Sequence, residues 1–146
     1  MTQRDLRPSA SYLWLERDEK ILLHQRANTG YMDGMYQMPA GHVDPGEVPS
    51  QAIIREAMEE IGITILPKHV SIQLISSRVN EHNSYYDFFF TASEWSGEPQ
   101  IMEPDKCTDL QWFALDNLPT NIIPYNKDII ELARKGLQYA EEGVDF

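Results

Sequence analysis

The feature that most constrains this chain is a loop rich in glycine and proline that leads directly into a helical pattern. Two glycines and two prolines stand within residues 40–49 and predict a tight, shaped loop. The pattern from Pro49 to Ile61 is helical, and Gly62 is a typical stop. At about 3.6 residues per turn, three carboxylates share one narrow face. These are Glu56, Glu59 and Glu60, and the apolar residues expected on the opposite, core-facing side are Ile54, Ala57, Met58 and Ile61.

The repulsion between these carboxylates lowers the stability of the helix when it is considered alone. Like charges four residues apart, here Glu56 and Glu60, destabilise an isolated helix by roughly 0.2–0.5 kcal/mol. Arg55 can offset part of this cost by pairing with Glu59. A divalent cation would offset more, because Mg²⁺ prefers carboxylate oxygens and leaves positions open for phosphate and water. On the helix alone, a solvated acidic surface is the simpler interpretation.

The preceding loop shifts the balance towards a metal site, because loop and helix together fit one fixed spacing. The spacing is G-x5-E-x7-R-E-U-x-E-E-x-G-U, where U is a bulky aliphatic residue. The matching residues are Gly41, Glu47, Arg55, Glu56, Glu59, Glu60, Gly62 and Ile63. With this pattern the chain resembles the Nudix hydrolases over residues 41–63. The departure at Ala57, a small residue where the pattern has a bulky one, concerns packing beneath the helix.

The resemblance implies a fold and a chemistry. The implied fold class is α/β (α+β), a Nudix-type α/β/α sandwich with a mixed central sheet, as a single domain over residues 1–146. The implied reaction is Mg²⁺-dependent hydrolysis of a phosphate anhydride, with Mn²⁺ as a substitute metal. The implied metal ligands are Glu56, Glu59, Glu60 and the backbone carbonyl of Ala40.

By the same resemblance, Arg55 orients the glutamates and Glu47 supports Arg55 across the loop. Either Glu59 or Glu60 is the base that activates water, and the resemblance leaves that choice open. A further acidic ligand is expected beyond residues 41–63. Glu103 is the candidate, with Glu81 and Asp87 as competitors, and an ordinary surface role is the alternative for each.

The substrate is less constrained than the reaction. Relatives that hydrolyse ADP-ribose tend to carry a proline beyond the motif, where this chain has Val79, and no tyrosine typical of dinucleoside-polyphosphate hydrolases follows. These absences favour the MutT-like group, which converts a nucleoside triphosphate to a monophosphate and pyrophosphate. Four residues are expected near the substrate: Tyr36 and Gln37 beside the base, His42 near a phosphate, and Asn126. The aromatic residues can equally fill the core.

Tyr125 and Asn126 occupy the stretch where oxidised-purine hydrolases carry acidic base-reading residues, which weakens a transfer of that specificity. Other functions stay open: a hydrolase of ADP-ribose or another nucleotide sugar, or a nucleotide-sensing domain without catalysis. The intact set of glutamates argues against the sensing domain. A prenyl-diphosphate isomerase shares the fold but relies on a catalytic cysteine, and Cys107 is isolated.

The composition of the chain limits the classes of molecule that it is expected to bind. A net charge of −11 is unsuited to gripping nucleic-acid backbones over a wide face. The first residues lack the apolar core of a signal peptide, and no apolar run approaches a membrane span. We therefore expect a cytoplasmic protein with a small nucleotide substrate, without stable nucleic-acid or membrane partners. A homodimer is compatible with these features.

The remaining pattern predicts further elements. Residues 9–15 and 21–25 read as a hairpin, and 36–38 as a short strand between two loops. Further strands are expected at 70–78, 85–91 and 110–115, a helical turn at 116–119, and a final helix at 125–139.

Overall fold

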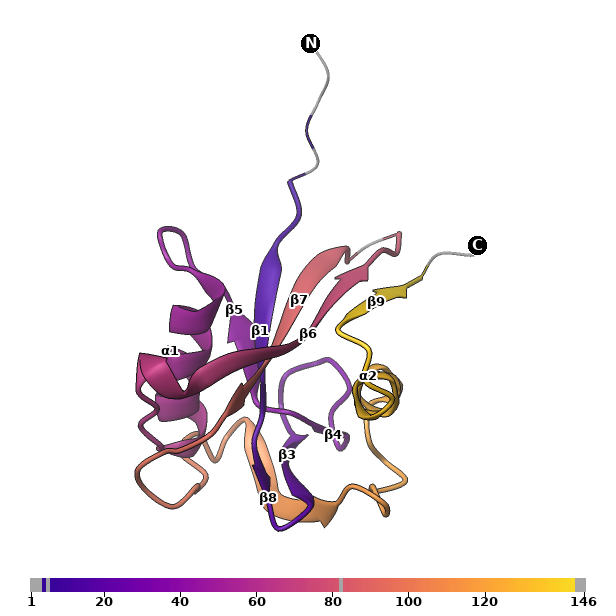
Figure 1. The fold of residues 1–146 in the computed structure, drawn as a ribbon. Helices are drawn as coiled ribbons and strands as arrows, with labels where there is room; N and C mark the ends of the chain where they lie inside the picture. The colour runs from indigo at the N-terminus through magenta and orange to yellow at the C-terminus, as the bar shows by residue number, and fades with distance from the viewer. Residues whose placement is uncertain (1–3, 5, 82, 144–146) are drawn as a thin grey trace.

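The computed structural model describes residues 4, 6–81 and 83–143. Its elements in chain order are β1 (Ser9–Trp14), β2 (Glu16–Arg17), β3 (Lys20–Arg26), β4 (Tyr36–Gln37), β5 (Ala40–His42), α1 (Pro49–Ile61), the 3₁₀ turn η1 (Pro67–His69), β6 (Val70–Arg78), β7 (Tyr85–Ala92), β8 (Cys107–Ala114), α2 (Pro124–Arg134) and β9 (Tyr139–Glu142). Figure 1 shows how they are arranged. No helix among the described residues is both long and apolar enough to span a membrane.

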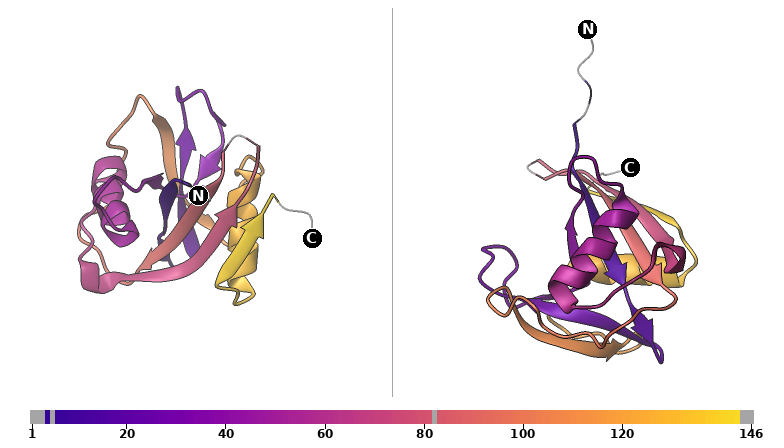
Figure 2. Two further views of the ribbon diagram at one scale, coloured as in Figure 1. Left: turned by 90° about the horizontal axis from the view of Figure 1, so that it is seen from above. Right: turned by 90° about the vertical axis from the view of Figure 1, so that its left-hand side faces the viewer.

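The strands form two sheets, one of them mixed. The mixed sheet has the order β5-β1-β7-β6-β9, in which β1 lies antiparallel to β5 and parallel to β7. In the smaller sheet, β3 pairs antiparallel with β2, β4 and β8. The two helices lie on opposite sides of the mixed sheet (Figure 2). The predicted α/β/α arrangement with a mixed sheet is therefore confirmed, and the smaller sheet is an addition to it.

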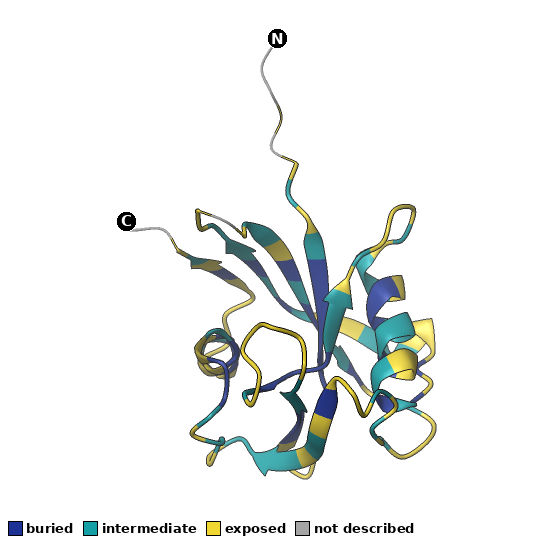
Figure 3. Cartoon of the chain, turned by 180° about the vertical axis from the view of Figure 1, so that it is seen from behind, coloured by how far each residue is buried: buried dark blue, intermediate teal, exposed yellow. Residues whose placement is uncertain are grey.

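Alternation along β1 explains the two core layers. Tyr12 and Trp14 pack in the same cluster as Ile129 of α2. Leu13, between them, packs in the same cluster as Ile53, Ala57 and Ile61 of α1. Because successive side chains of a strand point to opposite faces, one buried strand anchors both helices. Exposed residues gather in the loops and on the outer faces of the helices (Figure 3).

Local signals set the bounds of α1. Pro49 occupies the first helical position, and Gln51 Oε1 accepts from the Val48 N–H at 3.0 Å. Gly62 adopts the left-handed conformation, with φ of 70°, and its N–H bonds the Met58 carbonyl at 3.1 Å. This arrangement satisfies carbonyl groups that the helix end would leave unpaired. The predicted helix is confirmed at both ends.

The predicted core-facing side of α1 was wrong in part. Met58 is 44% exposed and Ile54 is only half-buried, whereas Ile53, Ala57 and Ile61 are buried. The helix is thus rotated from the predicted orientation. On a helical projection Glu60 lies between Glu56 and Ala57, so the rotation brings Glu60 against the core. The glutamates therefore do not form one solvated face.

Residues 9–15 and 21–25 do not form the predicted hairpin. The chain crosses between the sheets at Leu15, whose carbonyl accepts from the Leu22 N–H at 3.0 Å. The actual hairpin joins β2 to β3 through Asp18 and Glu19, which both have positive φ. β1 lies in the mixed sheet because both of its faces are apolar and need cover from two layers.

Three other element predictions also need correction. The final helix ends at Arg134, and Gly136 with φ of 88° turns the chain into β9, which pairs parallel to β6. Residues 116–119 contain a turn but no helix, and β5 forms within the predicted 40–49 loop. The apolar residues that extended the predicted helix past Arg134 are exposed: Leu137 is 46% and Tyr139 is 56% exposed.

Candidate active site

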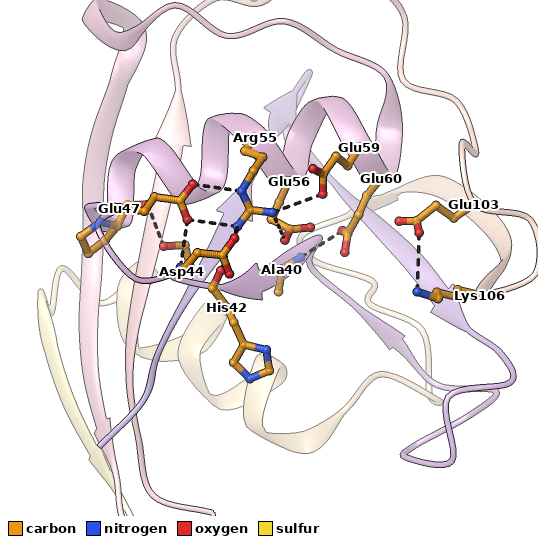
Figure 4. Close-up of polar contacts among 12 residues, drawn as sticks. Ala40, His42, Asp44, Glu47, Arg55, Glu56, Glu59, Glu60, Glu103 and Lys106 are labelled. Atoms are coloured by element: carbon orange, nitrogen blue, oxygen red, sulfur yellow. Dashed lines mark hydrogen bonds and ion pairs between the residues drawn. The ribbon is translucent and has the colours of Figure 1, made fainter. Parts of the chain in front are cut away.

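Arg55 lies at the centre of a network of carboxylates, drawn in Figure 4. Its Nε and Nη2 donate to the two oxygens of Glu47 at 2.9 and 3.1 Å, a bidentate contact. Its Nη1 donates to Glu56 Oε1 at 2.8 Å and to Glu59 Oε2 at 3.2 Å. One planar guanidinium therefore fixes three glutamates, as its fork geometry allows. The predicted Arg55–Glu59 pair and the Arg55–Glu47 contact are both present.

The loop before α1 is fastened to the same guanidinium. Arg55 Nη2 donates to the His42 carbonyl at 3.0 Å and lies 3.4 Å from Asp44 Oδ2. Glu47 Oε1 also accepts from the Asp44 N–H at 3.0 Å. Hydrogen bonds from Arg55 and from this backbone N–H lower the pKa of Glu47. Asp44 is not part of the sequence pattern, although its place three residues before Glu47 is compatible with a turn that closes on the glutamate.

Gly41 brings the backbone of β5 against a carboxylate. A Cβ atom at Gly41 would lie 2.2 Å from Glu56 Oε1 and 2.2 Å from Glu56 Cδ. Only the absence of a side chain allows this approach. Burial raises the pKa of Glu56, and the Arg55 contact opposes that rise. The carboxylate of Glu56 is therefore held in a fixed position beside the loop.

Glu60 is the most deeply set of the three helix glutamates. Burial raises its pKa well above the ordinary value, and the negative charge of Glu56 adds to the rise. The Ala40 N–H donates to Glu60 Oε2 at 3.2 Å, and this hydrogen bond opposes the rise in the pKa of Glu60. A carboxyl group in this position binds a proton more tightly than one in water. The predicted ligand Ala40 thus meets Glu60 through its backbone N–H.

Five carboxylates line one cavity of about 470 Å³, which we call the acidic cavity. They are Asp44, Glu56, Glu59, Glu60 and Glu103, and the cations in its lining are Arg26 and Lys106. Arg55 and Glu47 are not among its lining residues, so they support the wall from behind. The loop, the helix and the β7–β8 connection therefore all bring acidic groups to one space.

Among the predicted further acidic ligands, Glu103 is the one that reaches this cavity. Its Oε2 lies 3.7 Å from Lys106 Nζ, and its charge contributes to the raised pKa of Glu56 and Glu60. Asp87 is instead fully buried in an ion pair with Arg78, and Glu81 borders a different surface hollow.

A second cavity of about 460 Å³ adjoins the first, and four tyrosines contribute to its lining. We call it the aromatic cavity, and its lining includes Tyr12, Tyr31, Tyr85, Tyr125, Arg78 and Asn126. The two cavities share five lining residues, which are Arg26, Gln37, Ala40, Gly41 and His42. A ligand long enough to extend past these residues would contact both.

The predicted substrate-binding residues separate into two groups. Gln37 and His42 line both cavities, and Asn126 lines the aromatic one. Asn126 Oδ1 accepts from the Met38 N–H at 2.9 Å, which directs its amide. Tyr36 lines neither cavity: it packs edge-on against Phe113, with the ring centroids 4.9 Å apart, and its hydroxyl bonds Asp109. Tyr36 therefore belongs to the core, which was the alternative interpretation.

Two other residues line the acidic cavity although the sequence pattern indicates no functional role for them. His24, on β3, contacts Gln37 with 3.2 Å between its Nε2 and the amide nitrogen. Burial lowers the pKa of His24 to about 4, so the ring is neutral near pH 7. Cys107 is buried, as expected of an isolated thiol, and donates to the Asp109 carbonyl at 3.2 Å. Only the register of β3 against β4 and β8 brings these residues to the cavity.

Comparison with known proteins decides the family. The family model described as the NUDIX domain matches residues 5–133. The chain belongs to the Nudix hydrolase family. A MutT Nudix hydrolase from Burkholderia pseudomallei has a similar solved structure, with a TM-score of 0.79 and 28% sequence identity over 87% of this chain and 98% of that one.

Two curated Nudix relatives differ in how much of them this chain covers. The 8-oxo-dGTP diphosphatase of Escherichia coli K12 is 31% identical over 117 residues, which are 77% of this chain and 84% of the relative. The NAD-capped RNA hydrolase NudC of Stutzerimonas stutzeri is 33% identical over 116 residues, 78% of this chain. The chain spans 38% of the length of that relative. The Nudix region is therefore the part that the two proteins share.

Proposed function

We propose that this Nudix protein is a Mg²⁺-dependent pyrophosphohydrolase of nucleotides. The observation that carries the proposal is the acidic cavity, where Glu56, Glu59 and Glu60 of α1 meet Asp44 and Glu103. Clustered carboxylates that share one space repel each other, and a hard divalent cation is the group that relieves this repulsion.

The donor set suits Mg²⁺ in particular. Among the described residues, no group of three or more His, Cys, Asp or Glu side chains is arranged to hold a metal ion by itself. Mg²⁺ requires no such group, since it is held by one or two carboxylates together with water and substrate phosphates. The close approach of Gly41 to Glu56 leaves a carboxylate where a bulkier residue would displace it. We assign Glu56, Glu59, Glu60 and the Ala40 carbonyl as the groups that would supply these ligands, with Glu103 as a further one, and a bound ion would take one or two of the carboxylates.

When bound, the metal supplies neutralisation of phosphate charge and acidification of water. The protein supplies position. Arg55, held by Glu47, keeps Glu56 and Glu59 in fixed orientations, so little reorganisation is needed for in-line attack on phosphorus. Glu60 accepts the Ala40 N–H at Oε2, which leaves Oε1 to take a proton from the attacking water. Glu59 is the alternative base.

Nucleoside triphosphates are the substrates we favour, with monophosphate and pyrophosphate as products. The aromatic cavity adjoins the acidic one and offers flat rings for a base, while Gln37, His42 and Asn126 offer polar contacts. The likeness to the E. coli 8-oxo-dGTP diphosphatase, which extends over most of both chains, supports this choice. A nucleotide sugar such as ADP-ribose is the second candidate, because the two cavities share five lining residues and a longer substrate could extend across both.

The proposal is tested by turnover of a panel of nucleoside triphosphates, nucleotide sugars and dinucleotides. The expected result is release of pyrophosphate from a triphosphate only when Mg²⁺ or Mn²⁺ is added, and its loss in chelator. Turnover that persists in chelator would contradict the metal assignment. A panel without any turnover, with a nucleotide still bound, would instead indicate a nucleotide-sensing domain.

A further inference from the structure

Arg78, at the end of β6, forms an ion pair that the hydrolytic chemistry does not require. Its Nε donates to Asp87 Oδ2 at 3.0 Å, and its Nη2 lies 3.5 Å from Asp87 Oδ1. Asp87 is fully buried, and Tyr125 donates its hydroxyl to Oδ2 at 2.7 Å. The carboxylate is therefore satisfied on both oxygens, which fixes the guanidinium in one orientation.

Two tyrosine rings also hold the guanidinium. Its carbon atom lies 4.8 Å from the ring centroid of Tyr85 and 4.9 Å from that of Tyr125. Tyr85 is itself fixed, because its hydroxyl lies 3.1 Å from His42 Nε2. His42 belongs to the loop that Arg55 fastens. Arg78 is therefore preorganised and connected through two contacts to the acidic cavity.

Part of Arg78 remains available to a ligand. Its side chain is 19% exposed and lines the aromatic cavity but not the acidic one. Among residues 4, 6–81 and 83–143, no hydrogen bond engages its Nη1. A guanidinium carries five N–H groups and no acceptor, so Nη1 can only donate.

The charges around Arg78 indicate what it would donate to. The buried Asp87 balances its positive charge, so the pair exerts little net attraction on a phosphate. The described residues that line the aromatic cavity include no Asp or Glu, and the surrounding rings suit a flat, uncharged group. A directional donor beside such rings is suited to a carbonyl oxygen on a heterocycle.

We propose that Arg78 is a specificity-determining residue that recognises the carbonyl edge of an oxo nucleobase, such as guanine or uracil, in the aromatic cavity. This rests on the proposed function, since the same molecule must place its phosphates in the acidic cavity. Amino bases such as adenine and cytosine present an N–H₂ group at the corresponding position, and two donors would then face each other.

The test compares triphosphates that differ at this one group: GTP against ATP, and UTP against CTP. The variant is the double substitution Arg78→Met with Asp87→Asn, because removing Arg78 alone would leave Asp87 as an unpaired buried charge. We expect the wild-type protein to prefer the oxo base in kcat/KM by roughly tenfold to a hundredfold. In the double variant that ratio falls to near one, mainly through a higher KM for GTP and UTP.

Arg17→Met is the matched control. Arg17 also stacks on an aromatic ring, 4.5 Å from the Trp112 centroid, and also pairs with a carboxylate, Glu98, at 2.8 Å. It lines neither cavity, so this variant should keep both the turnover and the base preference. Thermal unfolding of both variants separates loss of recognition from loss of structure.

Three outcomes would overturn the proposal: a wild-type protein without base preference, a folded double variant that keeps the preference, or a double variant weakened equally for oxo and amino bases. The last would indicate a phosphate contact. If the double variant does not fold, Arg78→Lys decides, since lysine keeps the charge beside Asp87 but lacks the fork; an unchanged preference there would contradict recognition through Nη1. Failure of the proposed function is distinguishable, because no triphosphate would then be hydrolysed by the wild-type protein.

Discussion

The two adjoining cavities are built in opposite ways. Four of the five carboxylates of the acidic cavity come from residues 44–60, one continuous loop and helix. The aromatic cavity gathers Tyr12 from β1, Arg78 from β6, Tyr85 from β7 and Tyr125 from α2. The proposed chemistry is thus encoded by local spacing, while the proposed recognition is assembled from several segments. On this proposal the reacting centre can stay constant while the groups that contact the nucleobase vary independently.

The substitution Glu60→Gln is the strongest test of the proposal that the acidic cavity carries out the chemistry. The amide keeps the shape and can still accept from the Ala40 N–H, but it carries no charge and is not a base. We expect kcat to fall roughly 10²–10⁴-fold, measured as pyrophosphate release. Thermal unfolding should show an intact fold.

Glu98→Gln provides the control, since Glu98 is exposed and pairs with Arg17 outside both cavities. Near-normal turnover by Glu60→Gln would refute the proposed role of Glu60 in the reaction.

Gly41→Ala tests whether turnover requires the close approach of the Gly41 backbone to the Glu56 carboxylate. The added Cβ would meet the Glu56 carboxylate at 2.2 Å, so that side chain must shift. We expect kcat to fall on the order of tenfold to a hundredfold, because a misplacement of about 1 Å can cost that much. The apparent affinity for Mg²⁺ should fall with it.

Combining Gly41→Ala with Glu56→Asp shortens the side chain that clashes, so the two substitutions should not be additive. Strict additivity would contradict a direct contact between the two positions.

The stability of the metal-free protein should report the burial of Glu60. Its pKa is raised in the folded state, so protonation favours folding. Glu60 should therefore contribute more to the unfolding free energy as the pH falls from neutral towards the ordinary carboxyl range, and that contribution is absent at higher pH. Denaturant unfolding in chelator, at several pH values above about 5, measures it.

In this window His24 acts in the opposite direction, because burial lowers its pKa to about 4 and the unfolded state takes up the proton first. The contribution of Glu60 is therefore the difference in unfolding free energy between the wild-type protein and Glu60→Gln, and this difference should increase as the pH falls. An unchanged slope in the variant would mean that another group causes the pH dependence.

Tyr125→Phe should have the smallest effect and should act on the aromatic cavity alone. It removes the 2.7 Å hydrogen bond to Asp87 but keeps the ring over Arg78. We expect a loss of about 1–2 kcal/mol of unfolding free energy. KM should rise a few-fold, with kcat unchanged. A large fall in kcat would show that the two cavities are not independent.

Some predictions from the sequence succeeded because their signals are local. Pro49 at the first helical position and Gly62 with positive φ bound α1 within a single segment, and the apolar pattern of β6 gave residues 70–78. The prediction of a 9–25 hairpin failed because strand pairing depends on partners elsewhere. β1 lies between β5 and β7, and the sequence near Leu15 carries no sign of the change of sheet.

The sequence by itself determined the acidic loop and helix, because their spacing along one chain segment fixes which carboxylates can share a face. Only the tertiary structure decided that Glu60 lies against the core, because the rotation of a helix is set by the sheet that it packs on. The same holds for Arg78 and Asp87, which lie on neighbouring strands, and for Tyr125, which is 38 residues beyond Asp87. These three meet only through the β6–β7 register and the packing of α2. The proposed recognition of the substrate depends on such contacts, which no local pattern records.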